Sequence, residues 1–305
     1  MSRRSDAGRG EAAAGAAGTA GGVLYVVATP IGNLGDVTLR ALEVLRAVPL
    51  IAAEDTRLTR RLLDRYEIAV RTTSFHAQSG PGRIDELLEH LRQGFDLALV
   101  TDAGTPVVSD PGTDLVAAWA AEGGRVVPIP GASAVLAAVV ASGVAGPRWA
   151  FEGFLPRSGR ERRDRLARIA ADGRGTVLFE SPRRVAATLH DLAEACGANR
   201  PGAVARELTK IHETVSRGTL GELAAASSAG EIPARGEFVL IVGHVSADAA
   251  PSVAAVASAA DAETAARAEV ERLVASGVAR GDAARRVAGA TGLPRRRLYG
   301  AVPEA

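Results

Sequence analysis

The stretch VLYVVATPIGNLGD occupies residues 23–36 and joins a short apolar run to a glycine-bearing loop. Its first six residues are apolar and rich in β-branched side chains, and so short a run favours a buried strand over a helix. Helical patterns alternate with further strand-like runs downstream, and the clearest of these runs are 50–53, 97–100 and 125–129. Alternation of strand and helix with short loops predicts an α/β fold with a parallel sheet.

The second half of the predicted core has a different spacing of strands. Five strands are expected there, at 149–155, at 176–180, around Val204 and Val215, and at 239–242. The last three follow one another closely, which favours a more antiparallel α/β unit, because parallel neighbours need long crossover connections. We therefore predict an N-terminal α/β domain at 23–146 and a C-terminal α/β domain at 147–245.

Both ends of the chain differ from this core in composition. Residues 1–22 contain almost no large apolar side chains, so we predict a disordered tail there. Residues 246–260 are rich in Ala and Ser and predict a linker. Beyond them, 261–305 predict a basic helical appendage that resembles a helix-turn-helix, with a last helix opened by Arg295, Arg296 and Arg297. A nucleic-acid contact and an inert helical cap or dimerisation element both remain open for it.

Composition excludes several classes of protein. The chain has 305 residues, of which 47% are hydrophobic, and a formal net charge of +1, so any contact with nucleic acid must come from local patches. No apolar run approaches the roughly 20 residues that span a bilayer. The N-terminus also lacks the apolar region of a signal peptide, so we expect a cytoplasmic protein without membrane contact. Cys196 is the only cysteine, which excludes a disulfide framework and a cysteine-rich zinc site.

Three loops rich in Gly and Pro follow predicted strands, at 29–36, 102–112 and 130–134. Ligands of open α/β sheets bind beyond the carboxyl ends of the strands, and glycine lets the backbone approach them closely. Three unrelated tight turns are the alternative. Asp102 lies just past a buried strand, where a carboxylate suits a ribose diol. No G-x-x-x-x-G-K-[ST] motif is present, which excludes P-loop phosphoryl transfer.

Acidic residues follow the predicted strand at 50–53. Glu54 could act as a general base, and no histidine lies at the spacing of a metal ligand, so we expect no metal. The alternative is structural, with Asp55 or Thr56 capping the next helix. On that helix, arginines share one face and either contact RNA phosphates or face solvent, namely Arg57, Arg60, Arg61 and Arg65.

A second reactive segment is RELTKIHE at 206–213, which holds Lys210, the only lysine of the chain. Glu207 or Lys210 could assist a hydroxyl nucleophile, and salt pairing between strands is the alternative. Arg183 and Arg184 are further candidates for contact with an RNA backbone.

The motifs occur in one order along the core: LYVVATPIGNLGD at 24–36, IAAEDTR at 51–57, VTDAGTP at 100–106, SDPG at 109–112, PGASA at 130–134, FEGFLP at 151–156, FESPRR at 179–184 and RELTK at 206–210. This ordered set resembles the ribosomal RNA small subunit methyltransferase I family. The resemblance implies the two-domain fold of the tetrapyrrole methylases, with S-adenosylmethionine in a cleft between the domains. It also implies methylation of the 2′-hydroxyl of a cytidine in 16S rRNA of the 30S subunit, and a homodimer.

By the same resemblance the cofactor is held by residues of the strand-end loops and of the second domain, namely Pro30, Gly32, Asn33, Asp102, Ala103, Gly104, Pro106, Gly131, Ser133, Ala134, Phe154 and Leu155. We expect Asp102 to position the cofactor, while Glu54, Glu207 or Lys210 assists the ribose hydroxyl. Two other functions stay open. One is methylation of a tetrapyrrole by the same fold, and the other is RNA binding in ribosome assembly without catalysis.

Overall fold

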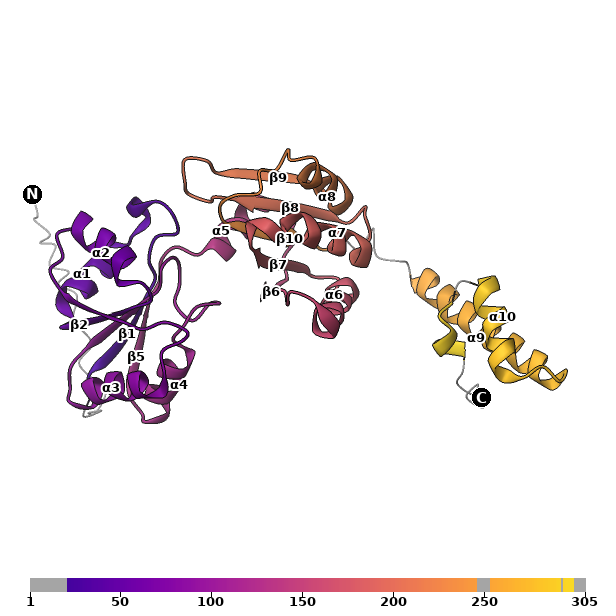
Figure 1. Cartoon of the computed structure of the whole chain (residues 1–305), viewed down its shortest axis with the longest axis horizontal. Helices are drawn as coiled ribbons and strands as arrows, with labels where there is room; N and C mark the ends of the chain where they lie inside the picture. Colours follow the sequence, from indigo (N-terminus) through magenta and orange to yellow (C-terminus); the bar gives the residue numbers. More distant parts are fainter. Residues whose placement is uncertain (1–20, 246–252, 292, 299–305) are drawn as a thin grey trace, which may run out of the picture. The chain divides into compact units, whose positions relative to one another are not determined.

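The structure is a computed structural model that describes residues 21–245, 253–291 and 293–298 (Figure 1). The chain divides into two compact units, Met1–His244 and Val245–Ala305. The first unit holds two five-stranded sheets. Of the tail predicted at 1–22, residues 1–20 lie outside the described residues.

The first sheet is wholly parallel, as the alternating pattern predicted, and its strand order is β3-β2-β4-β1-β5. Because all its strands run the same way, their carboxyl ends lie at one edge, and the Gly- and Pro-rich loops leave from that edge. Its elements are β1 (Val23–Val27), η1 (Leu34–Asp36), α1 (Leu39–Ala47), β2 (Leu50–Ala53), α2 (Thr56–Arg65), β3 (Arg71–Ser74), α3 (Pro81–Arg92), β4 (Leu97–Val100), α4 (Thr113–Ala121) and β5 (Arg125–Ile129).

Helices cover both faces of this sheet, which explains why its central strands are continuously apolar. Along β4, Ala98 belongs to a core cluster shared with α1 and α2, while Leu97 and Leu99 belong to a second cluster shared with α3 and α4. Both faces of β4 are therefore buried, and the strand cannot carry the polar alternation of a half-exposed one.

The second sheet has the order β6-β7-β10-β8-β9, and only β6 and β7 are parallel, so the prediction of a more antiparallel unit is confirmed. Its elements are α5 (Ala134–Ser142), β6 (Trp149–Phe154), α6 (Gly159–Ala171), β7 (Gly175–Glu180), η2 (Pro182–Arg184), α7 (Val185–Cys196), β8 (Pro201–Arg206), β9 (Thr214–Thr219), α8 (Leu220–Ser228) and β10 (Phe238–Val242). Residues of α6, α7 and α8 pack in one core cluster, and α5 contributes to another.

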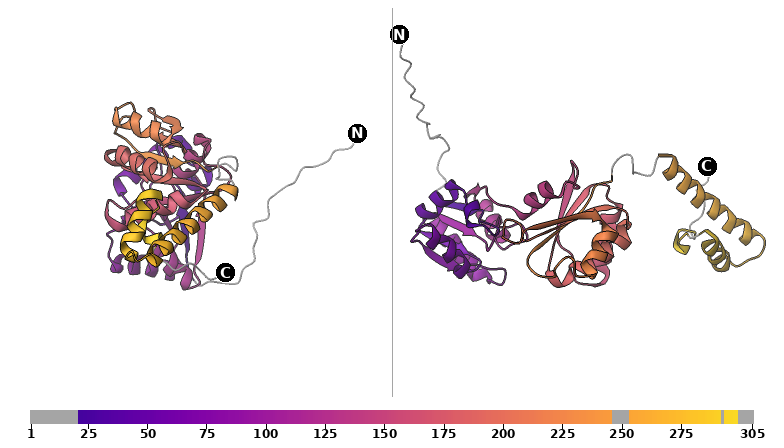
Figure 2. Two further views of the ribbon diagram at one scale, coloured as in Figure 1. Left: turned by 90° about the vertical axis from the view of Figure 1, so that its right-hand side faces the viewer. Right: turned by 90° about the horizontal axis from the view of Figure 1, so that it is seen from above.

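The second unit consists of α9 (Val253–Ala275), α10 (Arg280–Thr291) and the 3-10 turn η3 (Arg295–Leu298), and Figure 2 shows its two long helices folded against each other. The helical appendage predicted from residue 261 thus begins earlier, because alanine is the strongest helix former and extends the first helix through 253–260 of the predicted linker. Residues 246–252 lie outside the described part of the chain. In the described part, no helix is long and apolar enough to cross a membrane.

Candidate active site

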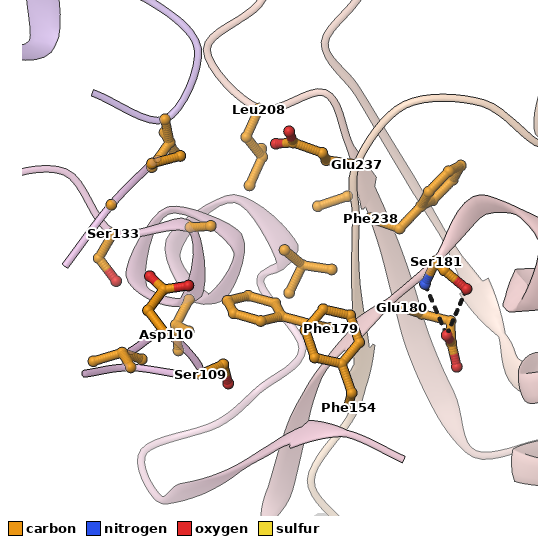
Figure 3. Close-up of a pocket in the computed structure, with 18 of the residues that line it drawn as sticks. Ser109, Asp110, Ser133, Phe154, Phe179, Glu180, Ser181, Leu208, Glu237 and Phe238 are labelled. Atoms are coloured by element: carbon orange, nitrogen blue, oxygen red, sulfur yellow. Dashed lines mark hydrogen bonds between the residues drawn. The ribbon is translucent and has the colours of Figure 1, made fainter. Parts of the chain in front are cut away.

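A cavity of about 350 Å³ opens at the carboxyl edge of the first sheet, and the second sheet closes its other side (Figure 3). Five of the expected cofactor residues line it, namely Ala103, Gly104, Ser133, Ala134 and Phe154. The lining also includes residues that the sequence did not single out, among them Ser109, Asp110, Phe179, Glu180, Ser181, Leu208, Glu237 and Phe238. Its volume is within the range of small-molecule sites, about 300–1,000 Å³.

Backbone pairing joins two of the strand-end loops into one rim. Thr29 and Gly104 exchange hydrogen bonds, with N–O distances of 2.8 and 3.0 Å, and form an isolated bridge between the loops after β1 and β4. Gly104 adopts φ +83, a left-handed conformation that favours glycine. A Cβ atom there would lie 3.4 Å from Ile31, another lining residue. Glycine is therefore favoured at this point of the rim by its backbone conformation, because the contact with Ile31 would be an ordinary van der Waals contact.

The loop after β4 carries backbone strain next to the cavity. Val107 has φ 77 and Ser109 has φ 66, and both values lie in the left-handed region. A β-branched residue such as Val107 rarely adopts that region, and such strain tends to occur at ligand-binding sites. The strained loop places Val108, Ser109 and Asp110 on the wall of the cavity.

An aromatic wall faces this loop from the second sheet. The ring centroids of Phe154 and Phe179 are 5.6 Å apart, and Phe151 packs edge-on against Phe179 at 5.0 Å. The register of β6 shifts between Phe151 and Gly153, and a Cβ atom on Gly153 would lie 3.1 Å from Ser109 Oγ. Such a bulge re-aims the side chain that follows it, and Figure 3 shows the rings of Phe154 and Phe179 side by side in the cavity. Aromatic faces of this kind suit a planar base.

Three carboxyl groups gather behind the other wall of the cavity, and only one of them, that of Asp110, lines the cavity itself. Glu54 Oε2 accepts a hydrogen bond from Asp102 N at 3.3 Å, and Asp102 Oδ1 accepts one from Asp55 N at 2.9 Å. Burial, followed by repulsion from Glu54, raises the pKa of Asp110 to about 6. Burial also raises the pKa values of Glu54 and Asp102. This wall is negative at neutral pH and therefore favours a cationic ligand.

Lys210, on the loop after β8, pairs with two carboxylates, one on the same loop and one directly before β10. Its Nζ atom lies 2.9 Å from Glu207 Oε1 and 3.1 Å from Glu237 Oε2, and Glu237 lines the cavity. Burial lowers the pKa of Lys210, but the hydrogen bonds to the two carboxylates outweigh it and leave the pKa above its usual value. The hydrogen bond from Lys210 lowers the pKa of Glu207. Salt pairing is thus present, but it joins Lys210 to its own loop and to the residue before β10 rather than joining two strands, and at neutral pH Lys210 is a cation and not a base.

The other residues expected to hold the cofactor do not line this cavity. Asp102 points its carboxylate at Asp55 N, Asn33 caps η1 by accepting from Gly35 N, and Leu155 lies in the core of the second sheet. Gly131 lines a second, more open cavity of about 550 Å³, which shares Ile31 and Ser133 with the first. Neither cavity is lined by Pro30, Gly32 or Pro106.

The three catalytic candidates lie at two different places, one on the first sheet and two on the second. Glu54 lies at the carboxyl edge beside Asp102, whereas Glu207 and Lys210 lie on the opposite side, on the second-sheet loop. None of the three lines the cavity itself. In the described part of the chain, no group of three or more His, Cys, Asp or Glu side chains is arranged to hold a metal ion.

The expected RNA-binding arginines fall into exposed and engaged groups. Asp55 caps α2 and also pairs with Arg57 at 2.7 Å, so the capping alternative is confirmed for Asp55. Arg60, Arg61 and Arg183 are exposed. Arg184, in contrast, donates inward to Leu155 O at 2.7 Å. In the second unit Arg295 donates to Gly281 O at 3.2 Å, and the side chains of Arg296 and Arg297 lie outside the described part.

Several lining residues that the sequence analysis did not name as site residues lie inside motifs that it quoted. Asp110 belongs to SDPG at 109–112, and Phe179, Glu180 and Ser181 belong to FESPRR at 179–184. A polar residue flanked by Pro and Gly after a buried strand could have identified Asp110. Nothing in the sequence indicated Glu237, because its place on the wall depends on how β10 lies beside β8.

Comparison with known proteins identifies the class of this fold. A family model described as Tetrapyrrole (Corrin/Porphyrin) Methylases matches residues 23–224. A solved cobalt precorrin-4 methyltransferase of cobalamin biosynthesis superposes with a TM-score of 0.58 at 18% identity, covering 72% of this chain and 94% of that one. A uroporphyrin-III C-methyltransferase from Thermus thermophilus, solved with S-adenosylhomocysteine, gives 0.53 at 18%, covering 73% and 97%. The fold and the cavity therefore define a member of the tetrapyrrole methylases.

Sequence relatives narrow this class. A protein of Synechocystis is 46% identical over 278 residues, which cover 91% of this chain and 96% of the relative. A protein of Escherichia coli O157:H7 is 46% identical over 224 residues, covering 73% and 78%. Both are named ribosomal RNA small subunit methyltransferase I, and the chain belongs to this family. The expected cofactor is confirmed by these methyltransferase names together with the demethylated cofactor bound to the Thermus relative.

Proposed function

We propose that this protein transfers a methyl group from S-adenosylmethionine to 16S rRNA of the small ribosomal subunit, at the 2′-hydroxyl of cytidine 1402. We further propose that it acts in the cytoplasm as a homodimer. The observation that carries the proposal is the cavity at the carboxyl edge of a parallel sheet, in a chain that matches named relatives along most of its length.

The cavity fits the proposed cofactor chemically. The faces of Phe154 and Phe179 suit the adenine, and the polar rim around Ser109 and Ser133 suits the ribose and the amino-acid end. The carboxylates of Asp110 and Glu237 suit a sulfonium and an ammonium group. When bound, the cofactor supplies an already activated methyl group, so the chain needs to provide alignment and exclusion of water.

The residues around the cavity must also assist a ribose hydroxyl, which is a poor nucleophile while it keeps its proton. Glu54 suits proton removal, because its raised pKa makes it a better base than an ordinary exposed glutamate. Lys210 keeps its charge and suits a phosphate or a developing oxyanion instead. The carboxylate of Asp102 accepts a hydrogen bond from Asp55 N. Asp102 would therefore fix the position of the loops at the rim rather than touch the reacting atoms.

The net charge of the chain is too small to attract RNA by itself, so contact with RNA depends on local groups of exposed arginines. Arg60 and Arg61 on α2 and Arg183 in η2 are exposed, and only a long 4.0 Å pair with Asp64 engages Arg60, so they suit contact with phosphates, which the proposal assigns to rRNA. The helices of the second unit, with Arg295 exposed, are proposed as a further contact.

The deciding experiment is transfer of labelled methyl from S-adenosylmethionine to 30S particles of a strain that lacks this enzyme, with mapping of the modified nucleotide. Incorporation at the ribose of cytidine 1402 supports the proposal. Incorporation elsewhere refutes the assigned position, and transfer to a porphyrinogen in preference to the particle supports the tetrapyrrole alternative. No transfer and no cofactor binding would support an RNA-binding protein without catalysis.

A further inference from the structure

A buried polar network lies directly behind the aromatic wall of the cavity. Its centre is Thr188 of α7, whose side chain is 1% exposed. The Thr188 hydroxyl donates to Glu180 Oε2 at 2.7 Å and accepts from Arg162 Nη2 at 3.0 Å. Arg162 in turn binds Asp191 Oδ2 through Nε and Nη2, at 2.9 and 2.7 Å. One hydroxyl thus connects an acid of β7 to an arginine of α6.

The network ends on the backbone of the wall itself. Arg162 Nη1 donates to Pro156 O at 2.9 Å, and Arg184 Nη2 donates to Leu155 O at 2.7 Å. These two carbonyls directly follow Phe154, the exposed aromatic residue of the cavity. The guanidinium groups therefore hold the turn that sets where the Phe154 ring lies.

The same network also fixes the neighbouring wall segment. Glu180 is 3% exposed and lines the cavity, and its Oε1 accepts from Ser181 N at 2.7 Å, a bond drawn in Figure 3. Its Oε2 lies 3.2 Å from Arg184 Nη2. Both oxygens of this buried carboxylate are used, so the segment that carries Ser181 and Pro182 has a single well-defined position.

Stability alone does not account for such an arrangement. Taking an arginine and a glutamate out of water costs about as much as their attraction returns, and apolar residues of similar volume often stabilise a core better. This network instead bonds the segment after Phe154 and the segment that carries Ser181. We therefore expect its main effect to be on the geometry of the cavity wall.

We infer that Arg162, Thr188 and Arg184 are positioning residues that hold the aromatic wall of the cofactor cavity. Arg184 thereby serves the cofactor site from within the second sheet, whereas its exposed neighbour Arg183 is left for RNA. This inference rests on the proposed function, because it assumes that the cavity holds S-adenosylmethionine.

Calorimetric binding of S-adenosylhomocysteine, without RNA, separates the two neighbouring arginines. For Arg184→Lys, which keeps the charge but loses the forked donor geometry, we expect Kd to rise at least fivefold. For the matched control Arg183→Lys, we expect Kd for S-adenosylhomocysteine within twofold of the wild type. An Arg184→Lys protein with unchanged Kd and a raised KM for 30S particles would overturn the inference and return Arg184 to the RNA-binding surface.

The hydroxyl of Thr188 gives a second test. Thr188→Val keeps the shape of the side chain and removes both of its hydrogen bonds. We therefore expect Kd for S-adenosylhomocysteine and KM for S-adenosylmethionine to rise, while kcat stays within twofold of the wild type. Thr188→Ser keeps the hydroxyl, so its Kd and KM should match those of the wild type. Thr176→Val, a buried threonine at the other end of β7, is the control for general destabilisation. Equal weakening by Thr176→Val, or none by Thr188→Val, refutes the inference. A wild-type chain that binds no S-adenosylhomocysteine refutes the proposed function instead.

Discussion

The side chain of Lys210 lies directly over Gly32, so that a Cβ atom at Gly32 would overlap Lys210 Cγ and lie 3.0 Å from Lys210 Cε and from Thr209 Oγ1. Gly32 does not adopt a positive φ, so its backbone would accept alanine. Glycine is therefore needed there for space and not for conformation. The contact joins the loop after β1 to the loop after β8.

Replacing Gly32 with alanine should act through Lys210. The added methyl group displaces the lysine stem and breaks the pairing of Nζ with Glu207 and Glu237, so we expect kcat to fall about tenfold or more. Steady-state kinetics of Gly32→Ala, Lys210→Ala and the double variant check this. In the Lys210→Ala background, Gly32→Ala should cost little more, since contacting residues are not additive. Fully additive losses would show that Gly32 acts independently of Lys210.

Removing the charges around the ribose hydroxyl should separate the catalytic candidates. We expect Glu54→Gln to lower kcat by about 100-fold, the scale of general base catalysis, while binding of S-adenosylhomocysteine stays intact. Glu207→Gln and Lys210→Ala should each lower turnover by less, since they remove one member of a charged pair. Single-turnover methylation of 30S particles measures all three. Unchanged turnover in any variant removes that residue from the catalytic set.

Asp110 should make cofactor binding depend on pH. Its pKa of about 6 means that the carboxylate forms as the pH rises through 6. Because S-adenosylmethionine carries a net positive charge and S-adenosylhomocysteine does not, we expect affinity for the former to rise severalfold between pH 5 and 7.5, and affinity for the latter to change less. Asp110→Asn should abolish the difference in slope. Calorimetry across this range checks it, and parallel profiles for the two ligands would contradict it.

The same residue should affect stability with the opposite sign. The folded pKa of Asp110 lies above its ordinary value of 3.8, so the folded state favours the protonated form. Its contribution to stability is complete below about pH 4 and is lost as the pH rises through 6. Asp110→Asn should therefore raise the free energy of unfolding by about 1 kcal/mol at pH 7.5, after allowance for partial exposure, and by nearly nothing at pH 3.5. Urea unfolding at both pH values measures this, and a gain at acid pH alone would refute it.

Exposed arginines of α2 should govern the salt dependence of RNA binding. Each phosphate contact that is lost lowers the slope of log K against log salt by about 0.7–0.9. We therefore expect Arg60→Gln with Arg61→Gln to lower the slope by roughly 1.5. The control is Arg92→Gln at the end of α3, where Arg92 pairs with Glu122 at 2.6 Å. A slope that the α2 pair leaves unchanged would place the RNA elsewhere.

Much of the fold could be predicted because short patterns of apolar residues mark where strands begin and end. β2, β4 and β5 begin and end where apolar runs predict them. α8 was missed although Thr219 and Glu222 form a capping box ahead of it, a signal that the short Ala- and Ser-rich helix does carry. Alanine was also misleading at 253–260, where a composition typical of linkers proved to be helical.

The sequence by itself determined the alternation of strand and helix, the Gly- and Pro-rich loops at strand ends and the motifs that mark the family, because each of these depends on residues close together in the chain. Only the tertiary structure decided which side chains meet. It paired Lys210 with Glu237, placed Asp110 opposite Phe154 and Phe179, and turned Arg184 inward to Leu155 O while leaving Arg183 in solvent. Strand order and packing set these contacts, and adjacent identical residues can then differ completely in burial and in partners.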